Sequence, residues 1–196
     1  MIPDQDSKSQ ISKPIKYAGV GSRQTPKDVL ELMESFASEL AKRNFILRSG
    51  NATGADLAFA TGANKIDPTL VELHLPWKKF NTEHIVDGNK LFVTGFDEEI
   101  RKFSAEYHPA WDKCDKHARS LHTRNATIVL GVSLDDPVNF LMCWTKDRTT
   151  WGGTGQAIRI ADAFGVPIIN MTGDGWDVEF SGVIQEIVRY KFGKKN

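Results

Sequence analysis

The stretch KYAGVGSRQTPKDVLELMESFASELAKRNFILRSG, residues 16–50, decides the fold. Residues 16–21 form a short apolar run that ends in glycine, which is typical of a buried parallel strand. A helix start follows, because Thr25 suits the N-cap and Pro26 suits the first helical position. Apolar residues then recur at helical spacing until Asn44, which closes the helix. The chain therefore enters a helix directly from its first strand.

The alternation of strand and helix continues beyond this stretch. Residues 45–50 read as a second strand, a short helix begins at about Gly54, and residues 70–77 read as a third strand. Short connections between alternating strands and helices indicate a parallel sheet with right-handed crossovers.

The remaining chain is predicted more coarsely. Residues 78–95 read as an excursion with short helical pieces, and residues 97–123 as mostly helical with an interruption at Pro109. Later elements are a strand over 138–144, a helix that starts near Gln156 and is capped by Gly165, a strand over 166–171 and a helix over 178–190. The sequence thus predicts an α/β, Rossmann-like three-layer domain with a mostly parallel sheet and helices on both faces. We expect residues 1–15 to be a flexible N-terminal arm and residues 16–196 to form one domain.

The composition narrows the class of protein. The chain has 196 residues, of which 40% are hydrophobic, and this suits one well-packed domain. A formal net charge of zero argues against a protein whose main task is to grip a nucleic-acid backbone. Two cysteines give no disulfide framework, and no apolar run is long enough to span a membrane. We expect a cytoplasmic protein with no membrane partner.

Three glycine-rich loops carry the functional signal: residues 19–26, 48–56 and 145–157. Each loop follows a predicted strand, so in a parallel sheet all three lie at the carboxyl edge, where ligands bind. Glycine lets the backbone approach a ligand, and the free N–H groups of a helix start attract an anion. The ligand-binding residues predicted on these loops are Gly21, Ser22, Arg23, Ser49, Gly50, Thr53, Gly54, Lys146, Gly152, Gly153, Thr154, Gly155 and Gln156.

The motifs GVGSR, SGNATGAD, RNATIVLG and GGTGQAIRIADAFGVPIIN, in this order, resemble the SLOG superfamily of Rossmann-like domains. That superfamily includes the DNA-processing protein A (DprA) domain and the LOG "lysine decarboxylase-like" phosphoribohydrolases. RNATI resembles the arginine–asparagine step of both families, which adds Arg124 and Asn125 to the predicted ligand-binding residues. The resemblance implies that the glycine loops hold a phosphate or phosphoribosyl group, with Arg124 as its cationic partner. A surface salt bridge is the alternative role for Arg124. For Asp56, contact with a ribose hydroxyl or catalysis competes with helix capping.

The sequence departs from the LOG pattern at the residue that matters for hydrolysis. LOG enzymes carry GGxGTxxE, whereas this chain has Gln156 in the threonine place and Arg159 in the glutamate place. Arginine stays protonated and cannot serve as a general acid or base at neutral pH. Another carboxylate would have to substitute, and the candidates are Asp56, Asp147 and Glu72. Cleavage of an N-glycosidic bond and simple ligand binding therefore both stay open.

The DprA resemblance implies a different partner, single-stranded DNA, which requires a basic groove with stacking aromatic residues. Trp77, Lys78 and Lys79 follow the third strand, and Trp144, Lys146, Arg148 and Trp151 precede GGTG. These aromatic residues could equally clamp a single base, and the zero net charge favours that interpretation. We therefore expect a nucleotide or nucleotide-derived ligand, with single-stranded DNA as the alternative partner. An interaction domain that binds no small ligand is the third possibility. We also expect a homo-oligomer.

A second group of side chains bears on metal binding: His108, Cys114, His117 and His122. Their spacing matches no familiar zinc pattern, and we expect helical placement to scatter them. The sequence therefore predicts no metal site and no cofactor.

Overall fold

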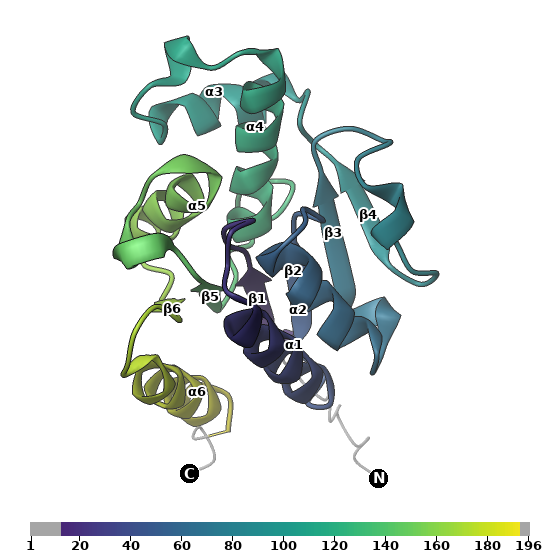
Figure 1. The fold of residues 1–196 in the computed structure, drawn as a ribbon, viewed down its shortest axis with the longest axis vertical. Coiled ribbons are helices and arrows are strands. Elements are labelled where there is room, and N and C mark those ends of the chain that lie inside the picture. The colour runs from purple at the N-terminus through teal and green to yellow at the C-terminus, as the bar shows by residue number, and fades with distance from the viewer. Residues whose placement is uncertain (1–12, 193–196) are drawn as a thin grey trace, which may run out of the picture.

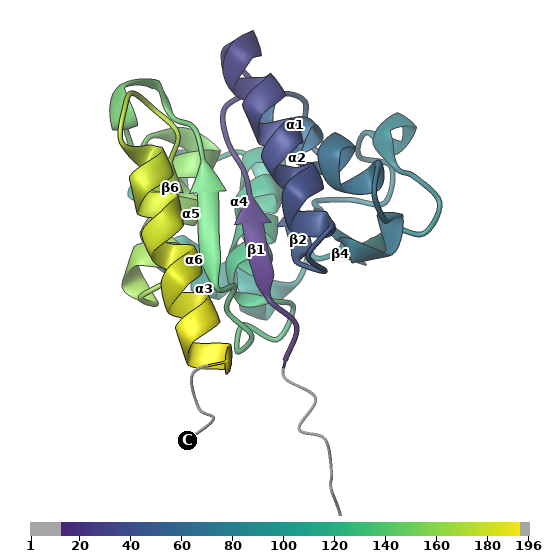
Figure 2. The same cartoon turned by 90° about the horizontal axis from the view of Figure 1, so that it is seen from below.

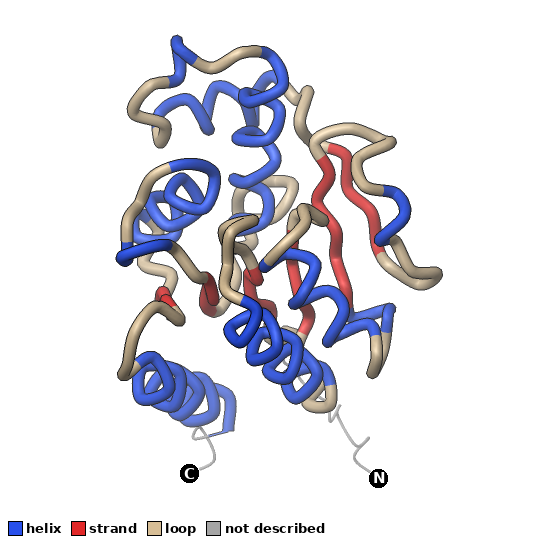
Figure 3. Tube along the Cα trace, viewed as in Figure 1, coloured by secondary structure: helices blue, strands red, loops and turns tan. Residues whose placement is uncertain are grey.

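The computed structural model describes residues 13–192 and contains one six-stranded sheet. Its strands are β1 (Lys16–Gly19), β2 (Ile46–Ser49), β3 (Val71–Leu75), β4 (Lys90–Val93), β5 (Phe140–Cys143) and β6 (Ile168–Asn170). They are ordered β4-β3-β2-β1-β5-β6, and every neighbouring pair is parallel. Figure 3 shows the strands as a layer between helices.

Six α-helices cover the two faces of the sheet. The helices α1 (Lys27–Ala41), α2 (Ala55–Asn64) and α6 (Trp176–Phe192) pack on one face, and α3 (Glu98–Glu106), α4 (Lys116–Leu130) and α5 (Gly152–Ala163) pack on the other. Figure 1 separates the two groups above and below the strands, and Figure 2 shows α1 and α6 in front of β1 and β5. The predicted three-layer Rossmann-like class is confirmed.

Alternation along the central strands divides the core into two parts. Tyr17 of β1 is fully buried on the α1, α2 and α6 face, where its ring stacks on Phe140 at 5.5 Å and meets the edge of Phe59. Its neighbour Ala18 points to the opposite face and packs with Leu141. Successive strand side chains point to opposite faces, so β1, which is buried on both faces, carries apolar residues at neighbouring positions.

The structure corrects several predicted boundaries. Residues 78–95 contain the predicted helical piece, Thr82–His84, but also the edge strand β4, which the sequence analysis missed. Three of the four β4 residues are exposed, so this strand lacks the continuous apolar pattern of a buried one. The helical region extends past Thr123 to Leu130, and residues 124–130 are all buried, four of them in the hydrophobic core.

The start of α1 also differs from the prediction. Pro26 takes the N-cap position, and the Thr25 hydroxyl donates to the Ser22 carbonyl at 2.7 Å instead of capping the helix. Most of the predicted arm, residues 1–12, lies outside the described residues. At its end, Ile15 is buried, and its carbonyl accepts the Ile46 N–H at 2.8 Å.

Candidate functional site

A cleft of about 460 Å³ lies at the carboxyl edge of the sheet. The chain runs outward from β1 through β2, β3 and β4, and then crosses to β5 on the other side of β1. The edge between β1 and β5 is therefore the switch point at which open α/β sheets bind ligands. The loops after β1, β2 and β5 all contribute to the cleft, together with one side of α4 and the first turn of α5. We refer to this hollow as the cleft.

The first turn of α5 forms one wall of the cleft. The helix begins at Gly152, so the predicted start near Gln156 is wrong and the GGTG segment is itself the first helical turn. No side chain caps this start, where Trp151 holds the N-cap position. The first N–H groups of a helix have no intrahelical partner, and together with the helix dipole they attract an anion. Gly152, Gly153 and Thr154 line the cleft at this point.

Arg124 and Asp56 form a buried ion pair beside this wall. Nη1 of Arg124 lies 3.5 Å from Oδ2 of Asp56, and each side chain is about 5% exposed. Burial raises the pKa of Asp56, although Arg124 and the Ala52 N–H oppose that rise, and burial lowers the pKa of Arg124. Arg124 is therefore not in a surface salt bridge. Nor does Asp56 cap α2, whose N-cap is Gly54.

Three glycines allow the loops to meet at the cleft. A Cβ on Gly50 would stand 1.2 Å from Nη1 of Arg124, so only glycine leaves room for the guanidinium there. Gly54 has a φ of +86°, and a Cβ there would lie 2.8 Å from the Ser22 carbonyl oxygen. A Cβ on Gly21 would lie 2.5 Å from Cβ of Ala55. The close packing of the first two loops depends on these glycines.

The rim of the cleft is cationic and carries one exposed aromatic side chain. Arg23 and Lys146 are exposed and line it from the loops after β1 and β5. Trp151, 79% exposed, lines it as well. Trp77 and Trp144 instead pack against the core, so a stacking role is left to Trp151 among these three.

The structure brings ten of the predicted site residues together in the cleft: Gly21, Ser22, Arg23, Asp56, Arg124, Asn125, Lys146, Gly152, Gly153 and Thr154. Ser49, Gly50, Thr53, Gly54 and Gly155 do not line the cleft. Sequence reasoning missed further lining residues on the same loops and on α4, including Gln24, Leu121, His122, Thr145 and Thr149. Leu121 precedes Arg124 by three residues, and His122 precedes Asn125 by three, which is a spacing signal once α4 is known to be a helix.

The other two predicted carboxylates lie away from the cleft lining. Glu72 of β3 is buried and accepts from Nε of Arg48 at 2.8 Å, while Arg48 also reaches Asp136 in the connection before β5. Asp147 is exposed in the loop after β5, with a φ of +53°. Among the described residues that line the cleft, Asp56 is the one carboxylate.

Gln156, predicted to bind ligand, is fully buried and connects three helices. Its Nε2 donates to the Ser104 carbonyl at 3.0 Å, and its Oε1 accepts from His122 Nδ1 at 2.7 Å and from Asn125 Nδ2 at 3.4 Å. Asn125 also donates to the Gly153 carbonyl at 3.2 Å. The amide of Gln156 thereby holds the first turn of α5 against α4.

The expectation that the histidines and the cysteine would scatter is wrong for three of them. His108, Cys114 and His122 offer ligand atoms that all lie within 4.8 Å of one another. His108 and Cys114 belong to the connection between α3 and α4, which folds back on α4, so helical spacing does not govern them. His117 is exposed and packs against Trp77 instead. Burial lowers the pKa of His108, and it lowers the pKa of His122 to about 4.

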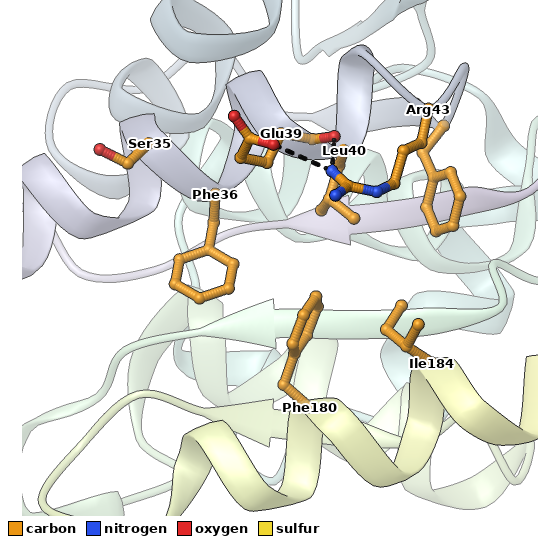
Figure 4. Close-up of a pocket in the computed structure, with 8 residues that line it drawn as sticks. Ser35, Phe36, Glu39, Leu40, Arg43, Phe180 and Ile184 are labelled. Atoms are coloured by element: carbon orange, nitrogen blue, oxygen red, sulfur yellow. Dashed lines mark hydrogen bonds and ion pairs between the residues drawn. The ribbon is translucent and has the colours of Figure 1, made fainter.

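A separate cavity of about 370 Å³ lies between α1 and α6. Figure 4 shows Phe36 on α1 and Phe180 and Ile184 on α6 around it, with Arg43 bonded to Glu39 at one side. This arginine already has a carboxylate partner at 3.0 Å, and most of the other lining side chains are apolar. The cavity therefore lacks the free cation that a phosphate site requires.

Comparison with solved structures places the fold among known ones. DNA processing protein A from Helicobacter pylori matches with a TM-score of 0.57 and 16% identity, over 93% of this chain and 82% of that one. The chain therefore shares the three-layer Rossmann-like fold of this DprA structure. DprA from Streptococcus pneumoniae matches with a TM-score of 0.52 and 18% identity, over 89% of this chain and 56% of that one. The structural-genomics target TM1055 matches with a TM-score of 0.50 and 18% identity, over 86% and 81%.

The sequence comparisons add no relative. No family model matches the chain, and no curated protein matches it. Within residues 13–192, no helix combines the length and apolar character needed to cross a membrane.

Proposed function

We propose that the cleft binds the phosphate of a nucleotide or nucleotide-derived ligand. The observation that carries this proposal is the uncapped first turn of α5, which lines the same cleft as Arg124, Arg23 and Lys146. Helix N–H groups and arginine side chains are the protein groups that bind phosphate most often. The volume of the cleft, about 460 Å³, falls in the usual range for small-ligand sites.

Arg124 has a donor to spare for such a ligand. Its Nη1 contacts Asp56, whereas its Nε is buried without a hydrogen-bond partner among the described residues. A buried donor without a partner costs free energy, and a phosphate oxygen would recover that cost. In this proposal Asp56 orients the guanidinium, and Trp151 stacks on the base.

The test is a pair of substitutions at Gly153. Gly153→Asp places a carboxylate in the first turn of α5, where it occupies the helix N–H groups and repels phosphate. Gly153→Ala is the matched control, because its Cβ would meet Asn125 Nδ2 at 3.4 Å, an ordinary contact. The probes are AMP, cyclic AMP, NAD and inorganic phosphate, titrated calorimetrically and then recovered by chromatography.

We expect at least one nucleotide to bind, the alanine variant to bind it similarly, and the aspartate variant to bind it at least 10-fold more weakly. Equal binding by wild type and Gly153→Asp would place the ligand elsewhere. Release of free base with turnover, abolished by Asp56→Asn, would add N-glycosidic cleavage to the function. Recovery of intact ligand would leave the protein a binder.

Single-stranded DNA is the second candidate, favoured by two observations. The H. pylori neighbour is described by its single-stranded DNA binding mode, and the exposed Trp151 lines the same cleft as Arg23 and Lys146. Strand binding predicts an affinity that rises with oligonucleotide length and falls steeply with salt. Trp151→Ala should weaken it further, because stacking contributes about 1–3 kcal/mol per base. An affinity for dT1 equal to that for dT12 would rule the strand out.

A further inference from the structure

A side-chain cluster beside the cleft has the composition of a metal centre: His108, Cys114 and His122. Each residue offers one ligand atom, and these atoms all lie within 4.8 Å of one another. Sγ of Cys114 lies 3.8 Å from Nδ1 of His108 and 3.9 Å from its Nε2. In tetrahedral zinc, with bonds of about 2.0–2.3 Å, ligand atoms lie about 3.3–3.6 Å apart. The cluster therefore needs side-chain shifts of about 1 Å to reach coordination distance.

The hydrogen bonds around His122 orient its ring as a metal ligand. The Ser104 carbonyl can only accept, so the Gln156 amide nitrogen faces it and Oε1 faces His122. Nδ1 of His122 must then carry the proton and donate at 2.7 Å, which leaves the lone pair on Nε2. Metal-binding histidines in proteins almost always donate their second N–H to such an acceptor. The chain from Ser104 through Gln156 to His122 supplies this arrangement.

Other residues next to the cluster also bear on metal binding. The Trp111 ring centroid lies 6.0 Å from that of His108 and 6.4 Å from that of His122, so an apolar ring packs beside the cluster. Burial raises the pKa of the Cys114 thiol, and the charge of Arg119, which lies over the Trp111 ring, opposes that rise. Binding through Nδ1 of His108 replaces its 3.2 Å hydrogen bond from the Ala110 N–H, which is the main cost.

We propose that His108, Cys114 and His122 bind a Zn²⁺-class ion as three protein ligands. Two imidazoles and one thiolate are the ligand types that zinc prefers, and three protein ligands leave a fourth coordination position for water or a substrate atom. His122 also lines the cleft, so the ion stands at the wall of that site. This proposal does not depend on nucleotide binding.

The test uses the full chain without a histidine tag, stripped with a chelator and titrated with Co²⁺ and Zn²⁺. We expect one ion per chain, a near-ultraviolet thiolate-to-cobalt charge-transfer band and the strong visible bands of tetrahedral Co²⁺. Zn²⁺ should displace the cobalt and raise the melting temperature. Cys114→Ser should remove the charge-transfer band and weaken binding at least 100-fold. His122→Gln should weaken it similarly.

His117→Gln is the matched control, because His117 lies on the same helix, is exposed and stands outside the cluster. It should bind Co²⁺ as the wild type does. Circular dichroism of the metal-free variants shows whether each one is folded. Weak metal binding by a folded variant then reports the loss of the ligand side chain and not the loss of the fold. The proposal is overturned if well-folded wild type shows no charge-transfer band. It is also overturned if folded Cys114→Ser retains wild-type affinity, or if the site takes Cu⁺ but not Zn²⁺.

Discussion

Gly155→Ala tests how α5 is seated at the cleft. Gly155 is buried in the first turn of the helix, against the loop that follows β5. A Cβ at this position would lie 1.8 Å from the Thr150 carbonyl oxygen and 2.1 Å from the Thr150 carbonyl carbon, whereas ordinary contact begins at about 3.4 Å. The obstructing atoms belong to the backbone, so no rotation of a side chain relieves the clash.

The expected cost follows from what must move. The Thr150 carbonyl also accepts from Nη1 of Arg159 at 2.6 Å, and Arg159 in turn donates to the Tyr107 carbonyl at 2.9 Å. Moving Thr150 therefore disturbs contacts to α5 and to the end of α3. Overpacking a well-packed site costs about 1–3 kcal/mol, and we expect the upper end, about 3 kcal/mol, for a backbone clash of this depth.

The assay is urea unfolding at 25 °C, followed by tryptophan fluorescence and by circular dichroism. A loss of about 3 kcal/mol corresponds to a fall in melting temperature of roughly 6–12 °C for a chain of this size. Gly153→Ala is the control in the same turn, because its Cβ meets only Asn125 Nδ2, at 3.4 Å. This variant should keep a free energy of unfolding within about 1 kcal/mol of wild type. Equal stability of Gly155→Ala and Gly153→Ala would refute the close approach of Thr150 to α5.

Two further predictions concern buried polar groups in the core. Tyr17 is fully buried, and its hydroxyl has no hydrogen-bond partner within the described part of the chain. Tyr17→Phe should therefore raise the free energy of unfolding by about 1 kcal/mol. A lower free energy of unfolding in urea would show that the hydroxyl has a partner. His74 is buried with Nδ1 bonded to Thr127 Oγ1 at 2.8 Å, and burial holds its pKa well below the ordinary value. Its contribution to stability is therefore present above the ordinary histidine pKa and is lost as the pH falls below it. Urea midpoints at pH 7 and pH 5 should differ less for His74→Phe than for wild type, and an unchanged difference would count against a neutral His74.

The central strands could be read directly from the sequence, because their signal is local. Residues 17–19 and 45–47 are apolar and lead into glycine-rich loops, and a strand covered by helices on both faces favours such a run. The edge strand β4 gave no such signal, since most of its side chains are exposed and its backbone pairs with β3 on one side. Likewise the first turn of α5 looked like a loop, because glycine is a poor helix former.

The sequence by itself determined the fold class and the three loops that meet at one edge, since parallel strands with short crossovers send every βα loop to the same side. Only the tertiary structure decided which side chains share the cleft. Asp56 became a buried partner of Arg124, while Glu72 turned to Arg48 and Asp147 to solvent. The same is true of His108, Cys114 and His122, which are brought together by a connection that folds back on α4. Sequence periodicity describes neighbours along one element, and these contacts join different elements whose packing no local pattern records.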